Sequence, residues 1–290
     1  MVTATPALTV RTVGPDDFNA IYPLLQLFDN KKMSEQDWRA MIFDYRWWHG
    51  PERGFALYAG ETAVGFFGTI FSKRRVLGRE ETFCNTACWI VREEFRAASM
   101  LLLKPILGLR NCTLVNYTPN DRAYQIFKKL GFIELESEQL FLHPLTTLPS
   151  LLGGSVVTDD KPLRRILGPD ETRIYTELEG TPKLKHFYLK RGHQGCYVVA
   201  TRSHAKRIPI AEIQHISNPR FFVKNIALMY RAATQHLGAV GLALDRRLLG
   251  QEQIPTAYRR TARRLYRPGA KDIVPSVVDN LFSELMILRV

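Results

Sequence analysis

The segment from Val91 to Leu102 contains residues whose types and order could do chemistry. We expect a strand that ends at Val91, a loop that carries Arg92 and Arg96, and a helix that begins near Ala98. The first amides of a helix have no intrahelical partner and lie at the positive end of the helix dipole. A loop and helix of this kind can therefore hold an anion.

A second informative spacing runs from Cys112 to Phe132. It predicts a short strand, a corner at Thr118-Pro119-Asn120, and a helix that the Asn120 side chain caps. The helix has one apolar face and ends at a glycine that can adopt a left-handed conformation; these residues are Ala123, Ile126, Phe127, Leu130 and Gly131. The simplest interpretation is a capped helix after a strand, which any α/β protein contains several times.

Together the two segments resemble the signatures of the GCN5-related N-acetyltransferases. The second segment is similar to the pattern Asn-x-x-Ala-x-x-x-Tyr-x-x-x-Gly-Phe, with Asn120 at its start and Phe127 in place of the tyrosine. The first segment is similar to a loop of that family that holds the pyrophosphate of coenzyme A. There Ser99 and Leu101 stand where the family prefers small glycine-like residues, so Leu101 is expected to turn inward.

The resemblance covers roughly Leu8 to His143 and implies an α/β (α+β) fold, with a mixed, mostly antiparallel sheet flanked by helices. It implies acetyl-CoA or another acyl-CoA as co-substrate, with no permanently bound cofactor. The coenzyme contacts that it implies are Ile90, Val91, Arg96, Ala97, Ala98, Ser99, Met100, Leu101, Asn120 and Phe127.

The resemblance also implies a mechanism in which an amine attacks the thioester carbonyl. Phe127 cannot protonate the departing thiolate. Tyr117 and Tyr124 are nearby substitutes, and of the two we favour Tyr117; a core or edge tyrosine is the alternative. We expect Glu81 as the general base, because the strand from Glu80 to Val91 is the usual source; an edge glutamate in solvent is the alternative. 

We expect two helices, Phe18–Phe28 and Ser34–Tyr45, followed by a hairpin of strands Phe55–Ala59 and Thr62–Phe71. The acceptor should lie opposite the coenzyme, above these helices and the hairpin. Trp47 and Trp48 lie there in the sequence, so we predict that one of them lines the cleft. Packing alone is the alternative role. We expect a small-molecule amine or a nucleotide-linked acceptor.

The second half repeats the order of strands and helices of the first half in a less regular form. Residues 144–162 are rich in Pro and Gly and predict a linker between a first domain, 1–143, and a second domain, 163–290. We interpret the second domain as a degenerate copy without its own coenzyme, and an unrelated α/β domain is the alternative. Its expected elements are strands Gly195–Thr201, Arg207–Ile216, Ala239–Leu244 and Leu281–Val290 and helices Pro219–His236 and Thr256–Tyr266.

The positive charge is concentrated in the second half. Residues 1–150 hold 17 Lys and Arg against 16 Asp and Glu, so the remaining 23 basic and 12 acidic residues carry +11 of the net +12. On the expected helix, Arg259, Arg263 and Arg264 form a basic surface that predicts an acidic partner. The alternative is a face that acidic residues of the first half balance.

The remaining composition is that of an ordinary globular chain. The four cysteines and seven histidines show no metal-type spacing, so we expect no metal site. No apolar run is long enough for a membrane span and no signal peptide is recognised, so we expect a cytoplasmic protein of unknown oligomeric state.

Three functional hypotheses follow. The first is an acyl-CoA-dependent N-acyltransferase, with acetyl as the expected acyl group. The second is a binding or regulatory protein that kept the fold and lost the chemistry. The third is a two-domain transferase whose donor is an acyl carrier protein or an aminoacyl-tRNA.

Overall fold

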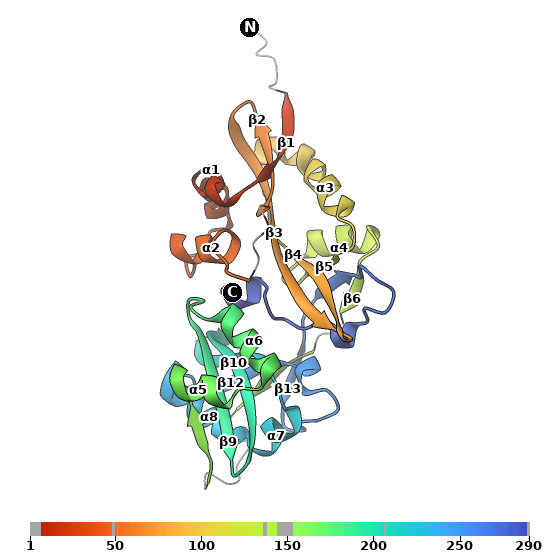
Figure 1. Cartoon of the computed structure of the whole chain (residues 1–290). Helices are drawn as coiled ribbons and strands as arrows, with labels where there is room; N and C mark the ends of the chain where they lie inside the picture. Colours follow the sequence, from red (N-terminus) through yellow and green to blue (C-terminus); the bar gives the residue numbers. More distant parts are fainter. Residues whose placement is uncertain are drawn as a thin grey trace.

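The structure is a computed structural model that describes residues 7–47, 50, 52–135, 138–143, 153–205 and 207–288. It contains two seven-stranded sheets, and helices flank each of them (Figure 1). The first sheet has the order β1-β2-β3-β4-β5-β14-β6, and the second has the order β13-β7-β12-β11-β10-β9-β8. Both are mixed and mostly antiparallel, so the predicted fold class and its duplication are confirmed.

The first sheet is built mainly from the N-terminal half. Its long strands are antiparallel neighbours, and β5 then pairs with β4 in parallel. Its N-terminal-half strands are β1 (Leu8–Val13), β2 (Gly54–Ala59), β3 (Thr62–Val76), β4 (Arg79–Val91), β5 (Thr113–Asn116) and β6 (Ile133–Leu135). Its helices are α1 (Phe18–Leu25), α2 (Glu35–Ile42), the 3-10 helix η3 (Glu93–Leu102), α3 (Leu103–Gly108) and α4 (Asp121–Lys129).

The side chains of β3 point alternately to the two faces of the sheet, and helices cover both faces. Phe66 and Ile70 pack in the core beneath α1 and α2, whereas Phe67 and Phe71 pack beneath α3 and α4. Successive side chains of a strand point to opposite faces, so a strand buried on both faces has consecutive apolar residues. Figure 1 shows the two helix pairs on opposite sides of the sheet.

The second half repeats this order, as the sequence predicts. The strand and helix order after residue 154 is β8 (Ser155–Val157), α5 (Asp160–Ile166), α6 (Pro169–Leu178), β9 (Leu184–Arg191), β10 (Gln194–Ala205), β11 (Ile208–Ile216), α7 (Pro219–Lys224), α8 (Ile226–Leu237) and β12 (Gly241–Asp245). β11 and β12 are parallel, like β4 and β5. The single helix expected over Pro219–His236 is divided into α7 and α8.

The two halves exchange one strand each. β7 (Glu138–Leu142) leaves the N-terminal half and lies between β12 and β13 (Tyr258–Thr261) of the second sheet. β14 (Arg264–Arg267) makes the reverse crossing and lies between β5 and β6 of the first sheet. The segment from Phe132 to Leu142 therefore contributes strands to two different sheets, and a boundary at 143 does not separate the sheets.

The helix predicted over Thr256–Tyr266 is wrong, because this segment forms β13 and β14. Leu265 and Tyr266 explain the difference: they pack into two different cores, on opposite faces of the first sheet. Neighbouring residues reach opposite faces in a strand and not in a helix.

Two further expected elements differ from the structure. The closing strand expected over Leu281–Val290 contains instead the 3-10 helix η7 (Glu284–Met286), and residues 289 and 290 lie outside the described residues. The helix expected over Ala98–Leu109 is shared between η3 and α3.

Candidate active site

The candidate site lies where β4 and β5 separate. The two strands pair only from Phe83 to Asn85 of β4 and from Thr113 to Val115 of β5. β5 then ends at Asn116, whereas β4 continues to Val91. The chain enters η3 after β4 and α4 soon after β5, so the gap between the strands is bordered by two helix starts.

One residue of β4 is bulged at this point. Phe66 pairs with Ile90 and Gly68 pairs with Ala87, so β4 has one residue more than β3 across the interval. Cys88 lies in this bulge and has a left-handed φ of 54°. A non-glycine residue in this region is strained, and such bulges and strain are found next to functional sites.

A groove of about 400 Å³ runs between β4, η3 and α4. Seven of the ten residues that the resemblance implies for the coenzyme line it: Ile90, Val91, Arg96, Ala97, Ser99, Met100 and Asn120. Trp89, Arg122, Ala123 and Ile126 complete the lining. The described lining thus carries two arginines and no carboxylate, which favours an anionic ligand.

Three of the expected coenzyme contacts do not line the groove. Leu101 is 46% exposed, so the expectation that it turns inward is wrong. Ala98 packs against the core below η3, and Phe127 is fully buried at the wall of the neighbouring pocket. The Asn120 cap is as predicted, because its Oδ1 accepts a hydrogen bond from the Ala123 amide at 2.8 Å.

The segment after β4 is more regular than the expected loop. It forms a continuous 3-10 helix of ten residues, in which Arg96 pairs with Glu93. Runs of this helix type longer than three or four residues are uncommon and often mark a functional or strained segment. Its amides are engaged within the 3-10 turns, so they are not the open cradle that the resemblance implies.

A second pocket of about 520 Å³ continues from the groove. The two cavities share Trp89, Asn120 and Ala123. The pocket wall is rich in aromatic side chains: Phe28, Trp38, Phe67, Trp89 and Phe127. Trp89 stacks on Phe67 with ring centroids 5.4 Å apart, and Phe28 stacks on Trp38 at 5.8 Å.

Glu284 supplies a carboxylate to this pocket from the C-terminal segment. Its side chain accepts a hydrogen bond from the Thr118 hydroxyl at 2.8 Å, and its amide donates one to the Asn85 side chain at 2.8 Å. The residue is 2% exposed, and burial raises the pKa of its carboxyl to about 7.

Sequence reasoning missed Glu284, and no local signal could have found it. Its two partners lie 166 and 199 residues earlier in the chain. Its own segment carries no motif, and only the tertiary fold brings it to the pocket.

The two residues expected to be catalytic lie elsewhere. Glu81 is five residues before Thr86, the first β4 residue of the pocket, which corresponds to roughly 16 Å along a strand. It pairs there with Arg79. Tyr117 is 3% exposed, and its hydroxyl donates a hydrogen bond to the Asp279 carbonyl, so neither side chain lines the groove or the pocket.

Trp47 also lies away from the pocket. It is 7% exposed, and its ring stacks on Tyr45 at 5.1 Å and packs against Phe282 at 5.8 Å. It therefore belongs to the core that joins the two halves. Trp48 lies outside the described residues.

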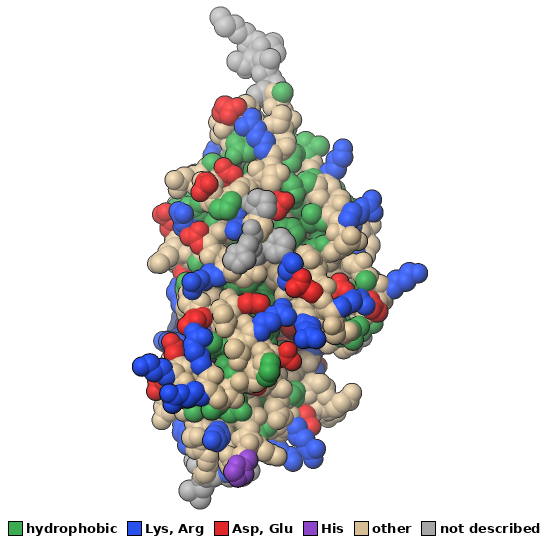
Figure 2. Space-filling view, in the orientation of Figure 1, with side chains coloured by type: hydrophobic (Ala, Val, Ile, Leu, Met, Phe, Trp, Pro, Cys, Tyr) green, Lys and Arg blue, Asp and Glu red, His purple; other side chains and the backbone are tan. Residues whose placement is uncertain are grey.

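The three arginines of the expected basic surface form ion pairs within the chain. Arg259 pairs with Glu138 at 3.5 Å and Arg263 with Asp121, while Arg264 is buried and pairs with Asp245 at 2.6 Å. Figure 2 shows that Lys and Arg side chains are spread over one face of the molecule, many of them close to Asp or Glu.

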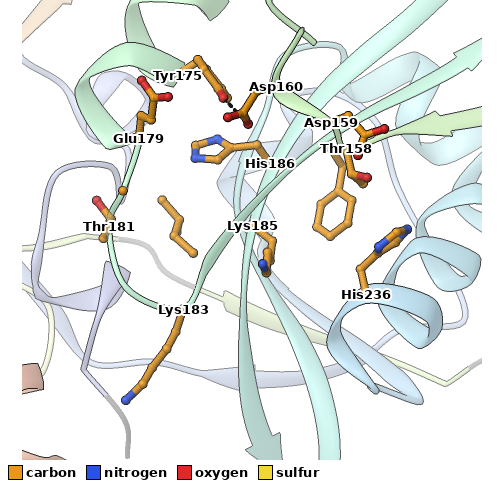
Figure 3. A pocket seen from close by; sticks show the side chains of 13 residues that line it. Thr158, Asp159, Asp160, Tyr175, Glu179, Thr181, Lys183, Lys185, His186 and His236 are labelled. Carbon is orange, nitrogen blue, oxygen red and sulfur yellow. Dashed lines mark hydrogen bonds between the residues drawn. The ribbon is translucent and has the colours of Figure 1, made fainter. Parts of the chain in front are cut away.

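A larger cavity of about 620 Å³ lies in the second half, between α5, α6, β9 and α8 (Figure 3). Several of its polar side chains have partners within the chain. The Tyr175 hydroxyl donates to Asp160 at 2.8 Å, and His186 Nδ1 lies 2.7 Å from the Tyr197 hydroxyl. Burial lowers the pKa of His186 to about 4, so its imidazole is neutral at physiological pH.

The described residues contain no arrangement of three or more His, Cys, Asp or Glu side chains that could hold a metal ion. In that same part of the chain, no helix is long and apolar enough to cross a membrane.

The fold is similar to that of several solved structures. A GCN5-related N-acetyltransferase from Anabaena variabilis matches with a TM-score of 0.62 and 12% identity, over 91% of this chain and 73% of that one. A GCN5-related N-acetyltransferase from Kribbella flavida matches with a TM-score of 0.56 and 14% identity, over 91% and 71% of the two chains. A protein of unknown function from Enterococcus faecalis, described as a probable N-acyltransferase, matches with a TM-score of 0.61 and 10% identity, over 90% and 72%.

Neither a protein-family model nor a curated protein matches the sequence. At these identities the likeness concerns the fold, and it extends over both halves of the chain. The chain therefore has the GCN5-related N-acetyltransferase fold in tandem, and each copy contributes one strand to the sheet of the other.

Proposed function

We propose that the protein is an acyltransferase that moves an acyl group, acetyl in the simplest case, from coenzyme A to an amine. The observation that carries this proposal is the continuity of the groove and the pocket at the separation of β4 and β5. A donor in the groove and an acceptor in the pocket would meet beside Trp89 and Asn120. Bringing two reactants together in this way is a large part of catalysis.

The donor would lie with its phosphates against Arg96, Arg122 and the Ser99 hydroxyl. Two guanidinium groups suit phosphates, because their donors match phosphate oxygens in geometry and charge. A bound anion would also compete for the amides of residues 96–101, which the 3-10 turns of η3 now engage. In the second half, the start of α7 is already capped, because the Asn218 side chain accepts a hydrogen bond from the Phe221 amide at 3.0 Å.

The acceptor would be an amine with an apolar body. The aromatic walls of the pocket favour such a body, and the carboxylates of Asp29 and Glu284 favour a cationic nitrogen. Phe127 has no proton to give to the departing thiolate. That thiolate is a tolerable leaving group near neutral pH, so chemistry does not require an acid at this position.

Thermal unfolding with and without ligand tests the donor site. Coenzyme A or acetyl-CoA at 100 times its Kd should stabilise the protein by about 2.7 kcal/mol. Ser99→Glu should remove most of this stabilisation, because it places a charge against the phosphates, whereas Ser99→Ala should keep most of it. Equal stabilisation of the wild type and Ser99→Glu would contradict the placement.

A catalytically silent binding protein is the second candidate, and the observation that favours it is the buried Phe127 ring. Consumption of acetyl-CoA thioester in the presence of an amine separates the two candidates. Binding of coenzyme A without any consumption would support the silent protein. A carrier protein or an aminoacyl-tRNA as donor stays a third candidate, and Arg259 and Arg263 are the exposed arginines that such a partner could contact.

A further inference from the structure

We propose that Glu284 takes the proton from the acceptor amine, so that the C-terminal segment of the second half completes the active site of the first. This inference rests on the proposed acyl transfer. It assigns the role of general base to Glu284 instead of Glu81.

The position of Glu284 is the first argument. Glu284 lines the pocket that shares Trp89, Asn120 and Ala123 with the groove, and its carboxylate is bound by Thr118, which lines the same pocket. A general base must come within hydrogen-bond reach of the proton that it removes, directly or through one water. Neither Glu81 nor Tyr117 lies on this wall.

The lack of a cationic partner is the second argument. Asp245, another buried carboxylate, pairs with Arg247 at 2.8 Å and Arg264 at 2.6 Å, and these partners lower its pKa. Glu284 is as deeply buried, but among the described residues no Lys, Arg or His forms an ion pair with it. A buried charge without such a partner is unfavourable, and groups of this kind are frequent at functional sites.

The surroundings hold the carboxylate in place without neutralising it. Thr118 donates to it from the turn after β5, and Asn85 of β4 accepts the Glu284 amide. Burial raises the carboxyl's pKa to about 7, and the Thr118 and Asn85 hydrogen bonds and the Arg264 charge of β14 oppose this rise.

Other titratable groups near the pocket do not take over this role. Cys88 of β4 is partly buried, and burial together with the Glu284 charge raises the pKa of its thiol, so a thiolate is disfavoured. Asp29 lies at the exposed wall of the pocket, and the buried Asp37 of α2 pairs with Lys183.

Protons and electron pairs balance in the proposed reaction, and solvent finally accepts the proton that the ammonium loses. The ammonium loses one proton to Glu284, and the freed nitrogen pair attacks the thioester carbonyl carbon. The carbon–nitrogen bond forms and the carbon–sulfur bond breaks, with its electron pair leaving on sulfur. The second nitrogen proton passes to the thiolate through water, and Glu284 returns its own proton to solvent.

The test measures loss of acetyl-CoA thioester from pH 5.5 to 9 with 2-phenylethylamine or 1,4-diaminobutane as probe acceptor. For the wild type, kcat should rise with pH and level off above a pKa of about 7. Glu284→Gln should lower kcat at neutral pH by about 100-fold or more, the usual contribution of a general base, with binding of coenzyme A unchanged. Its rate should climb with the fraction of free amine and should not level off near 7.

Two variants of Thr118 separate a catalytic from a structural role. Thr118→Val removes a hydrogen bond to the charged form, so the levelling point should move to higher pH, whereas Thr118→Ser keeps the hydroxyl and should keep the profile. A wild-type-like rate and profile in Glu284→Gln would overturn the assignment while leaving acyl transfer intact. Absence of transfer by the wild type to either amine, with coenzyme A bound, would instead overturn the proposed function.

Discussion

Glu284→Gln should make the protein more stable at alkaline pH, although it removes a carboxylate that we place in the active site. The folded carboxyl has a pKa of about 7, against 4.5 in the absence of burial. The folded state therefore holds this proton more tightly than the unfolded state does. Its contribution to stability is fully present below about pH 4.5 and is lost as the pH rises through 7.

The size of the effect follows from that difference. About 2.5 pKa units at 1.36 kcal/mol each give a penalty of about 3 kcal/mol above pH 8. Glutamine does not ionise and can still accept the Thr118 hydrogen bond. Relative to the wild type, the variant should therefore gain about 3 kcal/mol between pH 4.5 and 8, which corresponds to a Tm difference of roughly 5 °C for a chain of this size.

Thermal and urea unfolding at pH 5, 6, 7 and 8 would measure this gain. Glu252→Gln, a change at a partly exposed carboxylate in the turn after the 3-10 helix η5 (Arg246–Leu249), is the matched control and should show no such trend. A constant difference between Glu284→Gln and the wild type at all four pH values would refute the argument, because it would mean that the carboxyl ionises in the folded state as it does in water.

Two other predictions concern ionisable groups away from the pocket. Arg264→Met should destabilise the protein by about 3–5 kcal/mol, because it leaves the buried Asp245 with one cation fewer. Arg263→Ala, which removes an exposed ion pair, should change the stability by less than about 1 kcal/mol. Equal effects of the two variants in urea unfolding would contradict this ranking. His186 has its pKa lowered to about 4, so the stability it confers is present above pH 6.5 and is lost as the pH falls through 4. His186→Asn should flatten this acid loss in a pH series of Tm values, and an unchanged slope would show that the imidazole is free to ionise in the folded protein.

The parts of the site that the sequence predicted are those with local signals. The Asn120 cap, the apolar face of α4 and the strand that ends at Val91 each depend on residues within a dozen positions of one another. Propensity, capping and periodicity act over that range, so they predicted α4, whereas the family resemblance, carried by the same local motifs, implied the seven residues of the groove.

The errors come from contacts between distant residues. The arginines after Tyr258 recur with a helical spacing, but their segment crosses from one sheet to the other as β13 and β14. Tertiary pairing overrides local preference there. Glu284 was missed for the same reason, because its place in the pocket depends on Asn85 and Thr118.

The exchanged strands also decide which part of the chain is the unit of folding. In the first sheet, β6 pairs with β14, which follows the whole second half in sequence. A cut between Leu142 and Ser155 would leave β5 and β6 with open edges in one fragment and would take β7 from between β12 and β13 in the other. Open edges of this kind promote aggregation.

The two copies are therefore interlocked, and neither can be lost without opening the sheet of its neighbour. Pairings over such long sequence separations also slow folding. The second copy therefore needs no activity of its own to be retained during evolution. It is retained because its β14 pairs in the sheet of the first copy and β7 of the first copy pairs in its own sheet.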